Sequence, residues 1–330
     1  MVGAENMTPI EHARSFSRVS LDSISVGTVT DFDLFLPSEP GKEPVLYRHK
    51  SLRFTEAARE RLLRSHITTL YIDARDDAAY ERYLESNIDR ILTDETVDTD
   101  TKSEIMYKSA QRLVKDVLND PRAGNAVQRS SEFVEHTTAF MFQEPSALEA
   151  LMKVTSYDYY TYTHSVNVFV FGSSLAQRMG VDEETIKRYA MGALLHDLGK
   201  SRIDSSILNH PGKLDDEQWR IMKMHPAYGH KILVEQGVDD QMVLDVVRHH
   251  HEKRNGVGYP DGLRGDGISF FTAVTTIADI FDALTTRRSY KDAMSSFDAL
   301  RLMKEKMADE LAPDLFKQFI VMIGSPSGDG

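Results

Sequence analysis

The stretch A-M-G-A-L-L-H-D-L-G-K, from Ala190 to Lys200, decides the fold of the second half of the chain. Its apolar residues predict a buried helix, and Gly199 is the residue type that commonly ends a helix in a left-handed conformation. His196 and Asp197 would then lie in the last helical turn, inside the protein. Because a buried carboxylate without a partner is costly, Asp197 needs a cation beside it. That cation is either a basic side chain, Lys200 being nearest in sequence, or a metal ion.

The composition excludes several classes of function. A chain of 330 residues suggests two domains, and a net charge of −12 argues against a long nucleic-acid partner. There are no cysteines, so disulfides, thiolate metal sites and cysteine nucleophiles are excluded, and any metal must take nitrogen and oxygen ligands. We see no signal peptide and no apolar stretch of membrane-spanning length, so we expect a cytoplasmic protein without a membrane partner.

The first part of the chain, residues 1–92, has mixed periodicities that predict a small α+β domain. The expected strands are 19–21, 24–26, 29–36, 44–48 and 69–72, and the expected helices are 55–64 and 77–92. No pattern of metal ligands or nucleophiles occurs there. We therefore expect this domain to be regulatory.

The rest of the chain is predicted to be helical. Residues 93–145 form a helical connector, which could alternatively provide a homodimer interface through its amphipathic faces. Residues 146–324 form an all-helical domain, and 325–330 are a flexible tail. The fold class is therefore mainly α, with an all-helical domain preceded by a small α+β domain.

Eight of the twelve histidines lie between His164 and His251. His164 precedes three apolar residues by 4, 7 and 11 positions, so its side chain is expected on the buried face of a helix. His225 stands directly before Pro226. Because a residue before proline avoids the helical conformation, His225 should lie at a fixed junction between two helices.

The triple histidine at 249–251 follows a helix with a buried stripe of valines. His250 and His251 continue the buried side of this helix, whereas His249 follows Asp245 and faces partly outward. We therefore expect His250 and His251 to be metal ligands and His249 to lie at the rim. Asp279 occurs among apolar residues in the helix predicted for 272–286.

These inward-facing residues predict a metal centre. The predicted ligands are His164, His196, Asp197, His225, His250, His251 and Asp279. As independent core residues, each would need its own hydrogen-bond partner, and that is the structural alternative. Seven ligands are too many for one tetrahedral site and suit two ions about 3.5–4 Å apart.

The chain from about Tyr157 to Met307 also resembles a known family, the HD-GYP domain of the HD phosphohydrolase superfamily. The resemblance is carried by Y-T-Y-T-H-S-V-N-V at Tyr160–Val168, L-L-H-D-L-G-K at Leu194–Lys200, H-H-E at His250–Glu252, G-V-G-Y-P at Gly256–Pro260 and I-A-D-I-F-D-A-L-T-T-R-R-S-Y-K at Ile277–Lys291. It covers nearly half of the chain, and its motifs are highly specific.

Members of this family hydrolyse cyclic di-GMP with two or sometimes three iron or manganese ions. The resemblance therefore implies a phosphodiesterase in which hydroxide bridging two metals attacks cyclic di-GMP to give pGpG or GMP. It implies the same seven ligands, with Asp197 as the bridging carboxylate, and iron ahead of manganese. Members with three metals carry a glutamate where this chain has Tyr160, so the resemblance favours two ions.

The resemblance also implies residues that meet the substrate. Lys200 is expected to act in catalysis and, with Arg288 and Lys291, to donate charge-assisted hydrogen bonds to a phosphate. In these positions the structural alternative is solvated charges at helix ends. The loop residues Gly258, Tyr259 and Pro260 are expected to contact cyclic di-GMP or another signalling protein.

The chain departs from the family pattern in that loop. The family commonly reads R-W-D-G-S-G-Y-P, whereas this chain has K-R-N-G-V-G-Y-P at Lys253–Pro260. Two alternatives therefore stay open beside the cyclic di-GMP phosphodiesterase. One is a weakly active or inactive module that binds cyclic di-GMP or a partner protein through this loop, and the other is a phosphohydrolase of another nucleotide.

Overall fold

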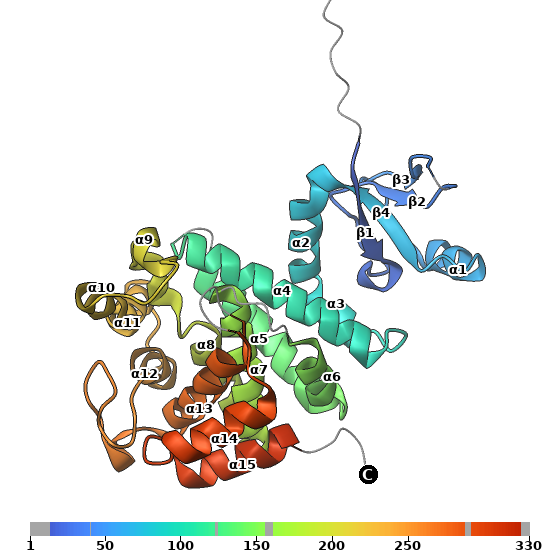
Figure 1. The fold of residues 1–330 in the computed structure, drawn as a ribbon. Helices are drawn as coiled ribbons and strands as arrows, with labels where there is room; N and C mark the ends of the chain where they lie inside the picture. The colour runs from blue at the N-terminus through green and yellow to red at the C-terminus, as the bar shows by residue number, and fades with distance from the viewer. Residues whose placement is uncertain (1–13, 40, 123–124, 156–160, 288–291, 325–330) are drawn as a thin grey trace, which may run out of the picture. The chain divides into compact units, whose positions relative to one another are not determined.

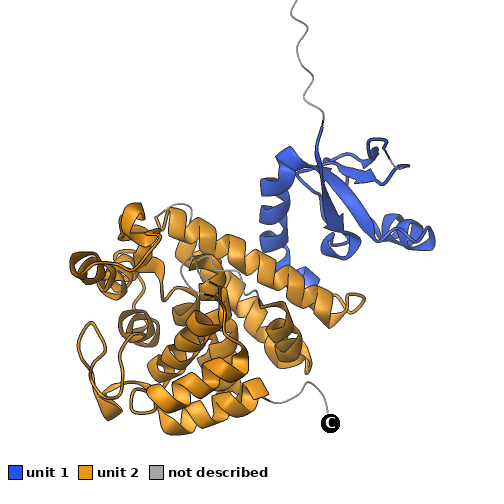
Figure 2. Cartoon of the chain, in the orientation of Figure 1, with its two compact units in different colours: residues 1–91 blue, residues 92–330 orange. Residues whose placement is uncertain are grey.

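The computed structural model describes residues 14–39, 41–122, 125–155, 161–287 and 292–324 (Figure 1). The chain divides into two compact units, residues 1–91 and residues 92–330 (Figure 2). The predicted boundaries at 92 and 145 stay predictions. The predicted tail at 325–330 lies outside the described residues.

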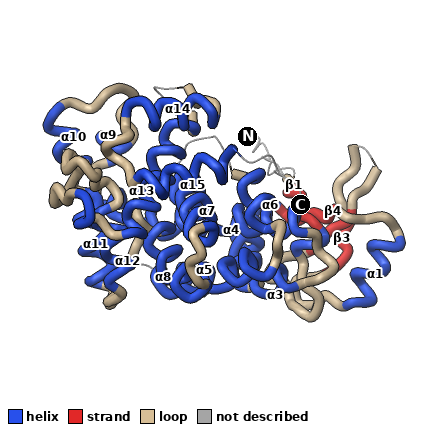
Figure 3. Tube along the Cα trace, turned by 90° about the horizontal axis from the view of Figure 1, so that it is seen from below, coloured by secondary structure: helices blue, strands red, loops and turns tan. Residues whose placement is uncertain are grey.

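Unit 1 is a small α+β domain, as predicted from its mixed periodicity. Its sheet is antiparallel, with the strand order β1-β4-β2-β3. The strands are β1 Phe16–Ser20, β2 Leu34–Leu36, β3 Val45–Arg48 and β4 Thr69–Asp73, and the helices are α1 Glu56–Arg64 and α2 Asp77–Ser86, followed by α3 Ile88–Thr93. Among the described residues, every strand of the sheet belongs to this unit (Figure 3).

Three predictions for unit 1 were wrong in detail. Residues 24–26 are not a strand, because Ser20 caps a short 3-10 helix, Leu21–Ser23, and the amide of Ser25 donates to the Tyr83 hydroxyl instead of to a neighbouring strand. The helix predicted for 77–92 is interrupted at Asn87, whose side-chain amide donates to the carbonyl of Tyr83. The strand predicted for 29–36 is restricted to β2.

Unit 2 consists of helices and short 3-10 segments in the residues that the structure describes. Its helices are α4 Thr99–Asn119, α5 Ala126–Gln143, α6 Ala147–Val154, α7 Thr161–Arg178, α8 Glu183–Leu194, α9 Ser205–Leu208, α10 Asp216–Met222, α11 His225–Glu235, α12 Gln241–His249, α13 Phe270–Thr285, α14 Ser296–Lys306 and α15 Pro313–Gly324. A 3-10 helix, η3, spans Leu198–Arg202. None of the described helices is both long and apolar enough to span a membrane.

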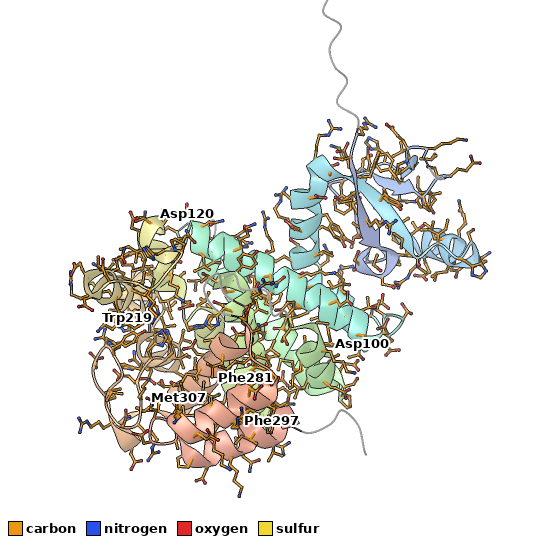
Figure 4. The ribbon with its side chains drawn as sticks, viewed as in Figure 1. Asp100, Asp120, Trp219, Phe281, Phe297 and Met307 are labelled. Atoms are coloured by element: carbon orange, nitrogen blue, oxygen red, sulfur yellow. The ribbon has the colours of Figure 1, made fainter. Side chains whose placement is uncertain are left out.

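Helix α7 is the centre of unit 2 and is buried along most of its length. It packs against α4, α8 and α13. The rings of Phe171, Phe281 and Phe319 meet edge to face at the contact of α7, α13 and α15, with Phe281 labelled in Figure 4. This packing fixes α7 and α13 against each other. Because both helices carry predicted ligands, it also fixes the distance between His164 and Asp279.

Candidate metal centre

The chain between α8 and α11 brings two predicted ligands together in a way that differs from the expectation. Helix α8 ends at Leu194, so His196 and Asp197 lie in the turn before η3 and not in a last helical turn. Gly199 does not adopt the left-handed conformation either. Its importance is steric, because a Cβ atom there would collide with the carbonyl oxygen of His225. The glycine therefore lets η3 contact α11 directly.

All seven predicted ligands converge in unit 2. Their ligand atoms form three overlapping groups, and within each group the atoms lie within 4.8 Å of one another. The groups are His225, His250 and His251; His164, His196 and Asp279; and His196, Asp197 and His250. The side chains come from α7, α11, α13 and the segments that follow α8 and α12. Clusters of buried histidines and carboxylates at these distances suggest metal binding.

Asp197 lies between the histidine groups. Its Oδ1 atom is 3.3 Å from His225 Nε2 and 4.0 Å from His250 Nε2. Its Oδ2 atom is 3.6 Å from His196 Nε2, 3.7 Å from His164 Nε2 and 2.5 Å from Lys200 Nζ. The two carboxylate oxygens therefore face different histidines, which is the arrangement that a bridging ligand requires. Asp197 also forms an ion pair with Lys200 at the same place, which is the expected alternative to a metal ion.

Asp279 also connects two parts of the cluster. Its Oδ1 atom is 3.0 Å from His164 Nε2, and its Oδ2 atom is 3.3 Å from His251 Nδ1. His225 Nε2 is 3.2 Å from His250 Nε2, and His196 Nε2 is 3.4 Å from His164 Nε2. Nitrogen atoms at these separations crowd around common points, as ligands of shared ions do.

Hydrogen bonds at Nδ1 fix the orientation of four histidine rings. His196, His225 and His250 each donate from Nδ1 to the carbonyl oxygen three residues earlier in the chain, at 2.8, 2.8 and 3.0 Å. His164 Nδ1 lies 2.6 Å from Asp282 Oδ2. Such hydrogen bonds fix the tautomer with the proton on Nδ1 and turn the Nε2 lone pair toward the centre of the cluster. Four histidines thus point Nε2 toward the centre of the cluster.

The protonation states of most of these groups suit a metal. Burial lowers the pKa of His196 and His250, and it lowers the pKa of His251 to about 3, so these rings are neutral at pH 7. Burial by itself would raise the pKa of Asp197 and Asp279, but Lys200 beside Asp197 and the hydrogen bond of His164 with Asp279 outweigh it, so the pKa of both carboxyls is lowered and both are ionised. Neutral imidazole and ionised carboxylate are the forms that coordinate metals.

His164 is the exception in the isolated chain. Burial lowers its pKa, but hydrogen bonds with Asp279 and Asp282 outweigh this effect and raise the pKa to about 10. Its ring therefore carries protons on both nitrogens at pH 7. A metal ion bound at Nε2 would have to displace one of them, while the Nδ1 proton stays with Asp282.

Sequence reasoning missed the residues that support His164. Asp282 accepts from His164 through Oδ2 and from the amide of Asn167 through Oδ1, the latter at 2.6 Å. Tyr107 in α4 donates to Asn167 Oδ1 at 2.6 Å. The available signal was spacing, because Asp282 lies one helical turn after Asp279, and Asn167 one turn after His164. Nothing in the local sequence indicated Tyr107.

Glu252 was missed as well. This carboxylate is buried next to two predicted ligands, and its Oε1 accepts from the backbone amides of Asp261 and Gly262 at 2.7 and 2.9 Å. Its Oε2 accepts from the amide of Leu263 at 3.0 Å. Gly258 allows close approach, because a Cβ atom there would lie 2.5 Å from Glu252 Cα. The loop that follows His251 is therefore folded back onto the metal cluster.

The predicted substrate contacts are placed in part. The ring of Tyr259 lies on that of His251, with centroids 4.7 Å apart, so this loop residue stands beside the cluster, and Pro260 follows it. Trp219 in α10, labelled in Figure 4, is 46% exposed. Its ring centroid lies 6.3 Å from that of Tyr259. Lys200 is next to Asp197, as described above. Arg288 and Lys291 lie outside the described residues.

His249 is held away from the cluster. Its Nδ1 atom is 2.7 Å from Asp245 Oδ1, and its Nε2 atom is 2.9 Å from Asp261 Oδ2. Asp261 also accepts from Nε and Nη2 of Arg248, at 2.8 and 2.9 Å. Both ring nitrogens of His249 are thus engaged by carboxylates outside the three ligand groups.

This placement gives a direct comparison between two adjacent histidines. His250→Ala should remove about one of two bound metal ions, because it deletes a nitrogen shared by two ligand groups. His249→Ala should leave the metal content unchanged. Elemental analysis of both purified variants after metal loading measures the effect. Equal losses in the two variants would show that His249, and not only His250, belongs to the coordination sphere.

The chain is similar in sequence to several known proteins. The family model described as "HD domain" matches residues 102–315. A cyclic di-GMP phosphodiesterase of Pseudomonas aeruginosa, PA4108, is 32% identical over 222 residues, which are 67% of this chain and 53% of that protein. The 3'3'-cGAMP-specific phosphodiesterase 3 of Vibrio cholerae is 38% identical over 157 residues, or 48% of this chain and 34% of that protein. This chain thus spans about half or less of the length of these curated relatives.

A solved structure shares the fold. The protein Bd1817 of Bdellovibrio bacteriovorus, described as an HDG"Y"P protein, superposes with a TM-score of 0.66 at 21% identity, covering 94% of this chain and 100% of that one. At this identity the likeness concerns the fold alone. It extends over both the α+β part and the helical part of the chain.

Proposed function

The chain belongs to the HD domain family, and on that premise we propose that it is a metal-dependent phosphodiesterase that hydrolyses cyclic di-GMP to pGpG or GMP. The observation that carries the proposal is the position of Asp197, whose two oxygens face different buried histidines. The seven residues predicted as ligands would hold two ions. Imidazole and carboxylate donors without thiolates suit both iron and manganese. Iron is the first choice because the family resemblance implies it ahead of manganese.

Bound metal would supply the main chemistry, since two adjacent cations lower the pKa of a shared water and offset negative charge on a phosphate. The protein's own groups would place the phosphate. Lys200 Nζ, which is now at Asp197, can donate to a phosphate oxygen beside the same carboxylate. Arg288 and Lys291 stay predicted as further phosphate donors. No side chain of the cluster is required as a nucleophile.

The loop with Gly258, Tyr259 and Pro260 would form one wall of the substrate site. The Tyr259 ring lies against the His251 ring and also has the Trp219 ring nearby, edge to face. Aromatic faces of this kind can stack on a nucleotide base, and removing the ring then lowers the affinity for the nucleotide. A role of this loop in binding another signalling protein, and a homodimer through the helical connector, stay predictions.

A second substrate has support from the relatives. One of them is named a 3'3'-cGAMP-specific phosphodiesterase, so this chain could act on a cyclic dinucleotide other than cyclic di-GMP. The altered loop at Lys253–Val257 supports a third possibility, a module that binds a cyclic dinucleotide with little turnover. These three readings predict different results in one experiment.

The experiment is metal analysis followed by hydrolysis assays under reducing conditions, with iron-loaded and manganese-loaded protein in parallel. We expect close to two ions per chain and conversion of cyclic di-GMP to pGpG or GMP that disappears with a chelator. Faster conversion of 3'3'-cGAMP would assign the second substrate instead. Binding of cyclic di-GMP without conversion in either metal form would favour the module. A protein that binds no metal would contradict both phosphodiesterase forms of the proposal.

A further inference from the structure

We propose that Tyr107 is a positioning residue for His164, which it reaches through Asn167 and Asp282. This inference rests on the metal centre of the proposed function and extends it to a helix that contributes none of the seven ligands. Tyr107 belongs to α4, within the segment predicted as a connector. The tyrosine hydroxyl donates to Asn167, which is not a predicted ligand, and this contact reaches His164 through the intervening side chains.

The connecting hydrogen bonds are short and converge on Asp282, which accepts from Asn167 on one side and from His164 on the other. The Tyr107 hydroxyl donates to Asn167 Oδ1, and Asn167 Nδ2 donates to Asp282 Oδ1, both at 2.6 Å. Asp282 Oδ2 then accepts from His164 Nδ1, also at 2.6 Å. His164 Nε2 faces Asp279 Oδ1 at 3.0 Å, inside the predicted metal centre. Three helices, α4, α7 and α13, thus contribute to one unbroken chain of hydrogen bonds.

This chain of hydrogen bonds lies in the interior of unit 2. Tyr107 is 4% exposed, Asn167 and Asp282 are each 1% exposed, and His164 is 2% exposed. Helix α4 packs along α7, the helix that carries both Asn167 and His164 (Figure 1). In a dry interior, hydrogen bonds are stronger and polarise one another, so a change at one end is transmitted better than at a wet surface.

The two neighbours of Asn167 determine how its side-chain amide is turned. The carboxylate of Asp282 can only accept, so it requires the NH₂ group of Asn167 on its side. The carbonyl oxygen then faces Tyr107, whose hydroxyl supplies the matching donor. Tyr107 therefore stabilises the one amide orientation in which Asn167 can hold Asp282. Asp282, held in this way, fixes the ring plane and the Nδ1 proton of His164.

This arrangement gives α4 an influence on the metal centre. A movement of α4 relative to α7 would stretch the bond between Tyr107 and Asn167. Because α4 follows unit 1 in the sequence, a change that reaches the chain at that point has a defined path to His164. The path ends at a single ligand, so its effect should be on affinity and geometry at one metal position.

The test uses Co²⁺ as the probe, because its visible absorption reports both binding and ligand geometry. Wild-type protein and Tyr107→Phe are titrated with Co²⁺ in competition with a chelator. We expect Tyr107→Phe to weaken Co²⁺ binding by about three- to tenfold and to alter the absorption band, less than the about 10- to 100-fold expected for Asp282→Asn, which removes a direct partner of a ligand. Combined in one chain, the two changes should cost less than the product of the separate losses, because they interrupt the same path.

The matched control is Tyr189→Phe. Tyr189 is another fully buried tyrosine of unit 2, and its hydroxyl lies 3.3 Å from Thr275 Oγ1 and outside the chain of hydrogen bonds. Both phenylalanine variants lose a buried hydroxyl, but only Tyr107→Phe should change Co²⁺ binding. If Tyr107→Phe does not fold, Tyr107→3-fluorotyrosine is used in its place. This variant keeps the ring and the hydroxyl but makes the hydroxyl more acidic, so it should shift the same absorption band.

The outcomes separate this inference from the proposed function. Failure of the wild-type protein to bind Co²⁺ would contradict the metal centre itself. If the wild type binds Co²⁺ but Tyr107→Phe behaves like Tyr189→Phe, the positioning role of Tyr107 is wrong and the metal centre stands. An unchanged absorption band for Tyr107→3-fluorotyrosine would count against the role in the same way.

Discussion

Asp197→Ala should lose both metal ions and reduce the hydrolysis of cyclic di-GMP by at least about a thousandfold, since a two-metal site supplies several kcal/mol of transition-state stabilisation. Asp197 faces His225 and His250 with one oxygen and His164 and His196 with the other. Asp197 thus lies beside four of the remaining six predicted ligands. Its removal therefore takes a ligand from each metal position and also leaves Lys200 without its carboxylate.

The measurement combines elemental analysis with an assay of the metal-loaded protein. Asp245→Asn is a suitable control, because Asp245 is a partly buried aspartate of the same unit that binds His249 and Thr272 and belongs to none of the ligand groups. The control should keep its metal and its activity. Two ions per chain in Asp197→Ala would remove this residue from the centre and leave the ion pair with Lys200 as its only role.

Lys200→Met should lower kcat by about a hundredfold while the metal content stays the same, an effect typical of losing one donor to a developing negative charge. Lys200 Nζ is 2.5 Å from Asp197 Oδ2, so it lies at the edge of the predicted metal centre without being a ligand. Charge on the phosphate oxygens is greatest in the transition state. An interaction with them therefore acts mainly on kcat and less on KM.

Arg202→Met provides the matched control for Lys200→Met. Arg202 is a basic residue of the same 3-10 helix, but it forms an ion pair with Glu235 on the exposed side. Both variants should fold and bind metal, and only Lys200→Met should slow the reaction. A rise in KM with unchanged kcat would mean that Lys200 holds the substrate in the ground state and does not act on the chemical step.

The candidate ligands could be found from sequence because their positions follow helical register. His164 and Asp279 occur on buried helix faces, and burial of a histidine or an aspartate among apolar residues requires a partner. The position of Gly199 was recognised, but its role was misjudged. A glycine that ends a helix and a glycine that permits close contact with another backbone look the same in a sequence, and only the packing of η3 on α11 distinguishes them.

The supporting residues could not be found in this way. Asp282 and His164 are 118 residues apart, and Tyr107 and Asn167 are 60 residues apart. Periodicity assigns a residue to a face of its own helix but does not say which other helix lies against that face. In unit 1 the same limitation applied to Ile24, which is buried as the periodicity suggests, although the backbone around it does not form a strand.

Glu252 holds the loop that follows it through backbone groups, so these contacts tolerate an unusual sequence at Lys253–Val257. Glu252 binds the amide groups of residues 261–263, and every amino acid except proline offers such a group at any position. These three bonds therefore do not depend on the identity of the side chains at Lys253, Asn255 and Val257. The side chains of Asn255 and Lys253 contact Asp309 and Glu310 instead. Substitution in this segment can thus change those contacts while the three bonds of Glu252 stay in place.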